Sequence, residues 1–87
     1  MLLHLIVKYQ WFTKIADETK KIEYRQIKSY WISRLEKKEF SEIIFRNGYQ
    51  SHSPFLRIQC KKIIKTQFFY KIYLGKILEI KNYPINR

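Results

Sequence analysis

Apolar residues recur along the chain at spacings that change from one stretch to the next, and each spacing predicts a kind of secondary structure. Residues 2–7 are nearly all apolar, which is typical of a strand buried on both faces or covered on its far face by a helix. Phe12, Ile15 and Ala16 follow at positions i, i+3 and i+4, the spacing of one helix face. We therefore expect the chain to begin with a strand and a short helix.

The middle of the chain predicts a strand, a second helix and another strand. In residues 21–25 apolar and charged side chains alternate, as they do on the two faces of a half-buried strand. A short helix is predicted over residues 29–35, whose apolar side chains share one side, with Ser29 as a candidate N-cap. Residues 40–45 are strand-like and end at Asn47-Gly48, a pair that readily takes positive backbone φ.

The last part of the chain predicts long strands with irregularities. The alternation in residues 56–60 changes phase at Lys61-Lys62, which predicts a bulge or bend. Residues 70–74 are again strand-like, Gly75 marks a second irregularity, and residues 77–80 continue the strand. The order β-α-β-α-β-β-β, with late strands at short spacing, predicts an α+β fold in which a small curled sheet closes into a β-barrel with two short helices.

Composition and charge narrow the class of protein. The chain has 87 residues, 46% of them hydrophobic and 17% aromatic, which excludes a disordered basic tail and fits one domain over residues 1–87. Its 18 Lys and Arg against 7 Asp and Glu give a formal charge of +11, which favours a polyanionic partner. The apolar run at residues 2–7 is shorter than the roughly 20 residues of a membrane span. The single Cys60 cannot form an internal disulfide, so we expect a soluble, cytoplasmic protein without a membrane partner. The sequence does not define an oligomeric state.

The stretch from Lys20 to Arg25 holds the clearest candidate chemistry. On a strand, Glu23 and Arg25 share a face about 7 Å apart, and Lys20 at the strand entrance can turn toward them. The cations could bind phosphate while the carboxylate accepts from a base edge, a sugar hydroxyl or a proton in transit. The alternative from spacing alone is a row of charges that pair across an exposed strand face.

Other polar residues offer weaker sites. His4 lies within an apolar stretch and is expected to be structural, and His52 lies in a polar loop. Neither has metal-ligand spacing with Cys60, and the chain has no Gly-rich phosphate loop, so we expect no metal and no ATP or NAD cofactor.

The aromatic residues divide between core packing and base stacking. A domain of this size needs large side chains in its core, and Trp31 also leans toward the core. Tyr30 and Tyr49 are open between core packing and stacking on bases. Core packing is expected for Trp11, Phe12, Phe40, Phe45, Phe68 and Phe69.

The chain resembles the ASCH domain family over essentially its whole length. The resemblance is carried by the stretch from Phe12 through Lys20-x-x-Glu23-x-Arg25, then Tyr30-Trp31-x-x-Arg34-Leu35, Ile44-Phe45-Arg46-Asn47-Gly48-Tyr49 and residues 73–80. It implies a β-barrel related to the PUA domains, with a cleft that holds RNA or a nucleotide. The family hallmark is Gly-x-Lys-x-x-Glu-x-Arg, and Glu18 stands here at the glycine position. By this resemblance the ligand-binding residues are Lys20, Glu23, Arg25, Tyr30, Arg46, Asn47, Gly48 and Tyr49.

The resemblance leaves the activity open. We expect an RNA- or nucleotide-binding module, and a small ribonuclease is the alternative, with Lys20 stabilising phosphorane charge and Glu23 acting as base. Other members resemble N4-acetylcytidine amidohydrolases, whose proposed nucleophile is a threonine. That position is Glu23 here, which weakens this alternative. A third class is an accessory protein whose basic surface docks an acidic partner or the ribosome.

Overall fold

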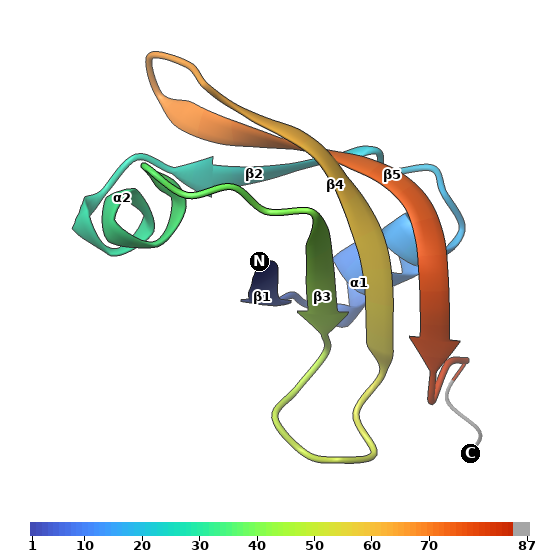
Figure 1. Ribbon diagram of the computed structural model, residues 1–87. Helices are drawn as coiled ribbons and strands as arrows, with labels where there is room; N and C mark the ends of the chain where they lie inside the picture. The colour runs from blue at the N-terminus through green and yellow to red at the C-terminus, as the bar shows by residue number, and fades with distance from the viewer. Residues whose placement is uncertain (85–87) are drawn as a thin grey trace.

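The computed structural model describes residues 1–84, which form a curled β-sheet with two short helices (Figure 1). This arrangement confirms the predicted α+β class and the predicted order of elements. The helix predicted over residues 29–35 has those bounds, although no side chain caps its first turn. In chain order the elements are β1 (Leu2–Ile6), α1 (Tyr9–Ala16), β2 (Ile22–Gln26), α2 (Ser29–Leu35), β3 (Glu42–Arg46), β4 (Phe55–Lys65) and β5 (Phe69–Lys81).

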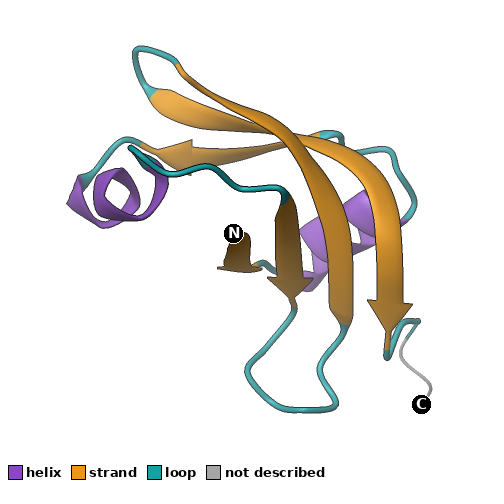
Figure 2. Cartoon of the chain, viewed as in Figure 1, coloured by secondary structure: helices purple, strands orange, loops and turns teal. Residues whose placement is uncertain are grey.

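The five strands form one sheet in the order β1-β3-β4-β5-β2. β1 runs parallel to β3, and the other neighbouring pairs are antiparallel. The sheet is a half-barrel, not the closed barrel that we expected (Figure 2). In residues 1–84 no ladder of backbone hydrogen bonds joins the edge strands β1 and β2. Instead the Arg25 guanidinium on β2 donates to the Ile6 carbonyl on β1 at 3.4 Å.

The core lies on the concave side of the sheet, where α1 and α2 contribute residues to it. Phe12 and Phe45 are fully buried, as predicted. Trp11 and Phe68 are 40% and 70% exposed, so the prediction of core packing is wrong for both. Phe68 lies in the turn between β4 and β5, and Trp11 lies on α1 beside the core-facing Phe12. The partly buried residues that pack against the core include Trp31 and Phe40.

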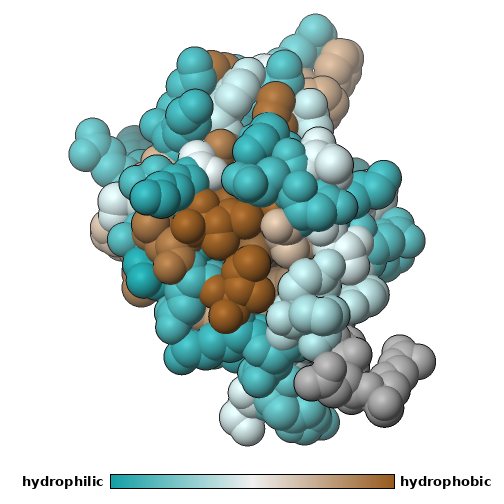
Figure 3. Space-filling model, turned by 90° about the vertical axis from the view of Figure 1, so that its right-hand side faces the viewer, coloured by the Kyte–Doolittle hydropathy of each residue, from teal (hydrophilic) through white to brown (hydrophobic). Residues whose placement is uncertain are grey.

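β1 is buried on one face only, which corrects the expectation that both faces are covered. Leu3 and Leu5 are buried, whereas Leu2 and Ile6 are 47% and 38% exposed. His4 is also exposed and so is not an internal histidine. The second face of β1 is the outer face of the sheet, opposite the core to which α1 and α2 contribute. Apolar residues also gather elsewhere on the surface: Figure 3 shows an apolar patch, ringed by polar residues, on the side of the molecule where β5 lies.

β4 and β5 form a long, irregular hairpin. Their register shifts between Cys60 and Lys62, where the sequence predicted a bulge, and again opposite Gly75, the second predicted irregularity. Such bulges bend a strand and increase its twist. The hairpin continues past Glu42, where β3 begins, and β3 pairs with β4 only over residues 55–59.

Candidate functional site

β2 turns its charged face inward. Glu23 is 7% exposed, whereas Tyr24 is 46% exposed. The sequence alternation correctly separates the two faces, but the apolar face is the outer one and the charged face is the inner one. A charge can be buried in this way when other charges and hydrogen bonds compensate it.

Lys20, Glu23 and Arg25 meet in one ion cluster. The Lys20 ammonium lies 3.3 Å from Glu23 Oε1 and donates to the Ile22 carbonyl at 2.8 Å. Arg25 donates to Glu23 Oε2 through Nε at 2.9 Å and through its terminal nitrogen at 2.6 Å. The structure thus brings together the three residues singled out by their spacing, with 9% exposure of the Glu23 side chain and 17% of each cation.

In this cluster the Glu23 carboxylate is engaged by two cations, whereas the Lys20 ammonium still has a hydrogen-bond donor for a ligand. Each oxygen of Glu23 already contacts a cation and its side chain is 9% exposed, so little of the carboxylate is open to a substrate. A lysine ammonium carries three N–H donors, and within residues 1–84 Lys20 contacts two acceptor oxygens. Lys20 therefore keeps one donor for a ligand.

The end of α1 positions Lys20. The Glu18 N–H donates to the Ile15 carbonyl at 3.1 Å and the Thr19 N–H to the Lys14 carbonyl at 3.0 Å, the two hydrogen bonds of a Schellman cap. That cap places its central residue in the left-handed region, and Glu18 has a φ of 66°. Glu18 therefore adopts the positive φ that the family's hallmark glycine would permit.

A short hydrogen-bonded turn precedes Lys20. Asp17 Oδ1 accepts from the Thr19 hydroxyl at 2.7 Å and from the Thr19 N–H at 3.0 Å. These two hydrogen bonds lower the pKa of Asp17, because they stabilise its ionised form. The turn is thereby fixed directly before Lys20.

Two exposed aromatic rings flank Lys20. Its ammonium lies 5.5 Å from the ring centroid of Trp11 and 5.5 Å from that of Tyr24. Lys14 lies 5.4 Å from the Trp11 ring, so cations and rings alternate here. A surface hollow of about 400 Å³, which we call the Lys20 site, is lined by Trp11, Lys14, Thr19, Lys20, Lys21, Ile22 and Tyr24.

The sequence did not predict that the Trp11 and Tyr24 rings belong to the Lys20 site. Trp11 was expected in the core with the other large aromatics, and Tyr24 was placed only on the apolar face of the strand. A usable signal was present for Trp11, because Trp11 and Lys14 are three residues apart and so share a helix face that differs from the face of Phe12 and Ile15.

Tyr30 is connected to the ion cluster through Trp31. The Arg25 guanidinium lies 4.9 Å from the Trp31 ring, and the Tyr30 ring meets Trp31 edge-on with 4.8 Å between centroids. The Arg34 guanidinium lies over the Tyr30 ring, 4.2 Å from its centroid. Tyr30 is 53% exposed, so it is a surface residue and not a core residue.

The loop after β3 contacts the chain just after the end of β1, beside the ion cluster. The Asn47 side-chain amide donates to the Val7 carbonyl at 2.9 Å, next to the Ile6 carbonyl that Arg25 contacts. Neighbouring carbonyls of an extended chain point to opposite sides, so Asn47 and Arg25 lie on either side of the end of β1.

The other predicted residues of this loop make separate contacts. Arg46 lies over the Phe55 ring at 5.0 Å, Gly48 has a φ of 126°, and Tyr49 is 88% exposed. A Cβ atom on Gly48 would lie 2.7 Å from Ser53 Oγ, so both its φ and its surroundings require glycine. The contacts within residues 1–84 do not join these three residues to the ion cluster.

Two kinds of feature are absent from the residues that the structure describes. Over residues 1–84 there is no group of three or more His, Cys, Asp or Glu side chains that could hold a metal ion. No helix in the same residues is long and apolar enough to cross a membrane.

Models of known protein families give no match to the chain, and neither do curated protein sequences. The likeness to the ASCH family therefore rests on the residues quoted for it.

Proposed function

We propose that the protein binds RNA or a nucleotide through the Lys20 site, as a module of the cytoplasm with a PUA-like fold. The observation that carries this proposal is the arrangement around Lys20. Its ammonium is held by Glu23 and Ile22, flanked by two exposed rings, and keeps a donor for an incoming oxygen.

The parts of the Lys20 site suit the two chemical parts of a nucleotide. Trp11 and Tyr24 offer flat, exposed faces, and a base stacked on an aromatic side chain gains roughly 1–3 kcal/mol. Lys14, Lys20 and Lys21 lie at the same hollow and supply ammonium groups for phosphate oxygens. The charge of +11 on the chain adds a long-range attraction for a polyanion.

Binding is favoured over turnover because of the state of Glu23. A general base must reach the proton that it removes, whereas both oxygens of Glu23 contact Lys20 or Arg25. In this proposal Glu23 orients the two cations. Arg25, Tyr30 and the loop of Arg46, Asn47, Gly48 and Tyr49 would contact a longer RNA beyond the Lys20 site.

The test is fluorescence anisotropy with a labelled single-stranded RNA of about 10 nucleotides. Trp11→Ala should weaken binding roughly 5- to 150-fold, the equivalent of one lost stacking contact. Lys20→Ala should also weaken it, and the affinity should fall steeply with salt. Phe68→Ala is the matched control, since Phe68 is an exposed aromatic outside the Lys20 site and should leave affinity unchanged.

Two results would contradict the proposal. Equal affinities for the wild type, Trp11→Ala and Lys20→Ala would remove the Lys20 site from RNA binding. Cleavage of the RNA that is lost in Glu23→Gln, seen on a denaturing gel, would favour the ribonuclease instead.

A further inference from the structure

The second half of β4 has one free edge. The last backbone contact on the β3 side is the Cys60 N–H, which donates to the Ser41 carbonyl at 2.9 Å. Residues 61–65 continue beyond this point and pair only with β5 among the described residues.

The hairpin register shows which backbone groups face the free edge. The Thr66 N–H donates to the Phe69 carbonyl at 2.8 Å, so these residues form a hydrogen-bonded pair. Such pairs alternate with non-hydrogen-bonded pairs along an antiparallel ladder. Ile63 and Lys65 fall at the non-hydrogen-bonded positions, opposite Ile72 and Tyr70. Their N–H and C=O groups therefore point away from β5, toward the free edge.

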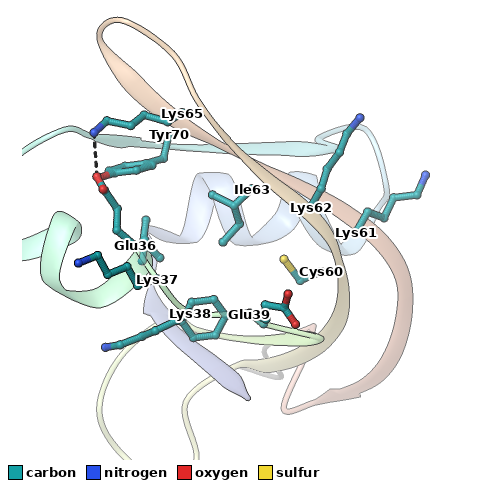
Figure 4. Close-up of a pocket in the computed structure, with 12 residues that line it drawn as sticks. Glu36, Lys37, Lys38, Glu39, Cys60, Lys61, Lys62, Ile63, Lys65 and Tyr70 are labelled. Carbon is teal, nitrogen blue, oxygen red and sulfur yellow. Dashed lines mark hydrogen bonds and ion pairs between the residues drawn. The ribbon is translucent and has the colours of Figure 1, made fainter.

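A hollow of about 560 Å³ lies beside this edge, between β4 and residues 35–40 (Figure 4). It is closed at both ends. At one end Ser41 binds Cys60 through the backbone, and at the other the Glu36 carboxylate binds the Lys65 ammonium at 2.8 Å. The five residue steps from Cys60 to Lys65 span about 16 Å in an extended strand. We call this space the β4 window.

The segment opposite β4 is held away from the free edge. Lys37 has a φ of 61°, which interrupts an extended backbone, and the Lys38 ammonium donates to the Ser33 carbonyl on α2 at 3.0 Å. Among residues 1–84, residues 37–40 form no ladder with β4, which leaves this edge without a neighbouring strand.

The β4 window has an apolar floor and a basic rim. Figure 4 shows Cys60 and Ile63 pointing into the hollow and Lys61 and Lys62 pointing away from it. Burial raises the pKa of the Cys60 thiol, so the thiol is neutral and contributes apolar surface. The charged residues around the hollow are Lys37, Lys38, Lys61, Lys62 and Lys65, with Glu36 and Glu39.

We propose that the β4 window binds an acidic peptide in extended conformation, as an added strand on the free edge of β4. The backbone of the peptide would pair with Ile63 and Lys65, and alternate side chains of a strand point to opposite faces. One apolar side chain would then enter the hollow, while its acidic neighbours meet the lysine rim. RNA suits this surface less well, because the outward carbonyls of Ile63 and Lys65 need N–H donors and repel phosphate oxygens.

Amide hydrogen exchange measured by NMR tests the backbone pairing. The probe is a capped pentapeptide of alternating glutamate and isoleucine, added to the full chain. Exchange at the Ile63 and Lys65 amides should slow about tenfold or more. The Lys62 and Ile64 amides, which already pair with β5, should not change. This alternation distinguishes strand addition from simple charge attraction.

Matched peptides and protein variants separate the contribution of backbone pairing to peptide binding from that of charge. The same peptide with N-methylated backbone should not protect the two amides, and a lysine-for-glutamate peptide should not bind. Lys61→Glu with Lys62→Glu should weaken binding, whereas Lys76→Glu, outside the β4 window, should not. Trp11→Ala should leave peptide binding unchanged, so the proposal stands or falls independently of RNA binding.

Three results would overturn the inference. The first is protection of the Ile63 and Lys65 amides without peptide, which would mean that residues 37–40 close the edge themselves. The second is protection by an RNA oligomer and not by the peptide. The third is equal binding of the N-methylated and unmodified peptides.

Discussion

Removal of the Glu23 carboxylate should destabilise the protein far more than removal of an ordinary surface carboxylate. Glu23→Gln keeps the shape of the side chain but leaves Lys20 and Arg25 without their shared anion. Breaking a fully buried ion pair costs about 3–5 kcal/mol. Each cation retains 17% side-chain exposure, so water offsets part of this cost. We therefore expect a loss of about 2–3 kcal/mol in the free energy of unfolding, somewhat below the buried limit.

The assay is urea and thermal unfolding followed by circular dichroism. For a domain of this size the expected loss corresponds to a fall of roughly 10–20 °C in Tm. Glu42→Gln is the matched control, because Glu42 pairs with Arg57 at 2.9 Å but the two side chains are 31% and 33% exposed. That change should cost about 1 kcal/mol or less.

Equal losses in the two variants would refute the reasoning, because the Glu23 cluster would then be worth no more than a half-exposed ion pair. RNA affinity gives an independent measure on the same proteins. Under the proposed function Glu23→Gln should also weaken RNA binding, because Lys20 and Arg25 lose the anion that orients them.

Two further predictions concern backbone conformation and pH. Glu18→Gly should be more stable than Glu18→Ala by about 1 kcal/mol in urea unfolding, because residue 18 is left-handed; equal stabilities would show that φ carries no cost there. Burial, followed by a hydrogen bond to Glu36, raises the pKa of Tyr70 to about 12 from an ordinary value of 10.0. The unfolded chain therefore ionises first, and the wild type should lose stability relative to Tyr70→Phe as pH rises from 10 to 12; a constant difference would contradict this assignment.

Local patterns predicted the elements because their causes are local. The phase change at Lys61-Lys62 is a consequence of side-chain alternation within one strand, and it coincides with a register shift in the structure. The helix over residues 29–35 was likewise visible in the spacing of its own apolar residues.

Side-chain orientation was harder to predict because it depends on distant strands. Alternation separates the two faces of β2 but does not say which one is inside. The structure places Glu23 and Arg25 on the inner face, where Arg25 reaches the Ile6 carbonyl on β1. The same limitation explains the error on β1, because an apolar run does not reveal whether a helix covers the second face of the strand.

Salt dependence should distinguish the two proposed surfaces, because each uses the excess of lysine differently. At the Lys20 site the ammonium groups are the direct ligands of phosphate, so RNA affinity should fall steeply as counterions compete. At the β4 window lysines surround a free backbone edge. Lysine on such an edge disfavours pairing with a second copy of the same basic chain, while an acidic strand can still form its backbone hydrogen bonds at Ile63. Added salt should therefore abolish RNA binding before peptide binding, in anisotropy titrations of both ligands on one protein sample. The opposite order would mean that charge alone holds the peptide.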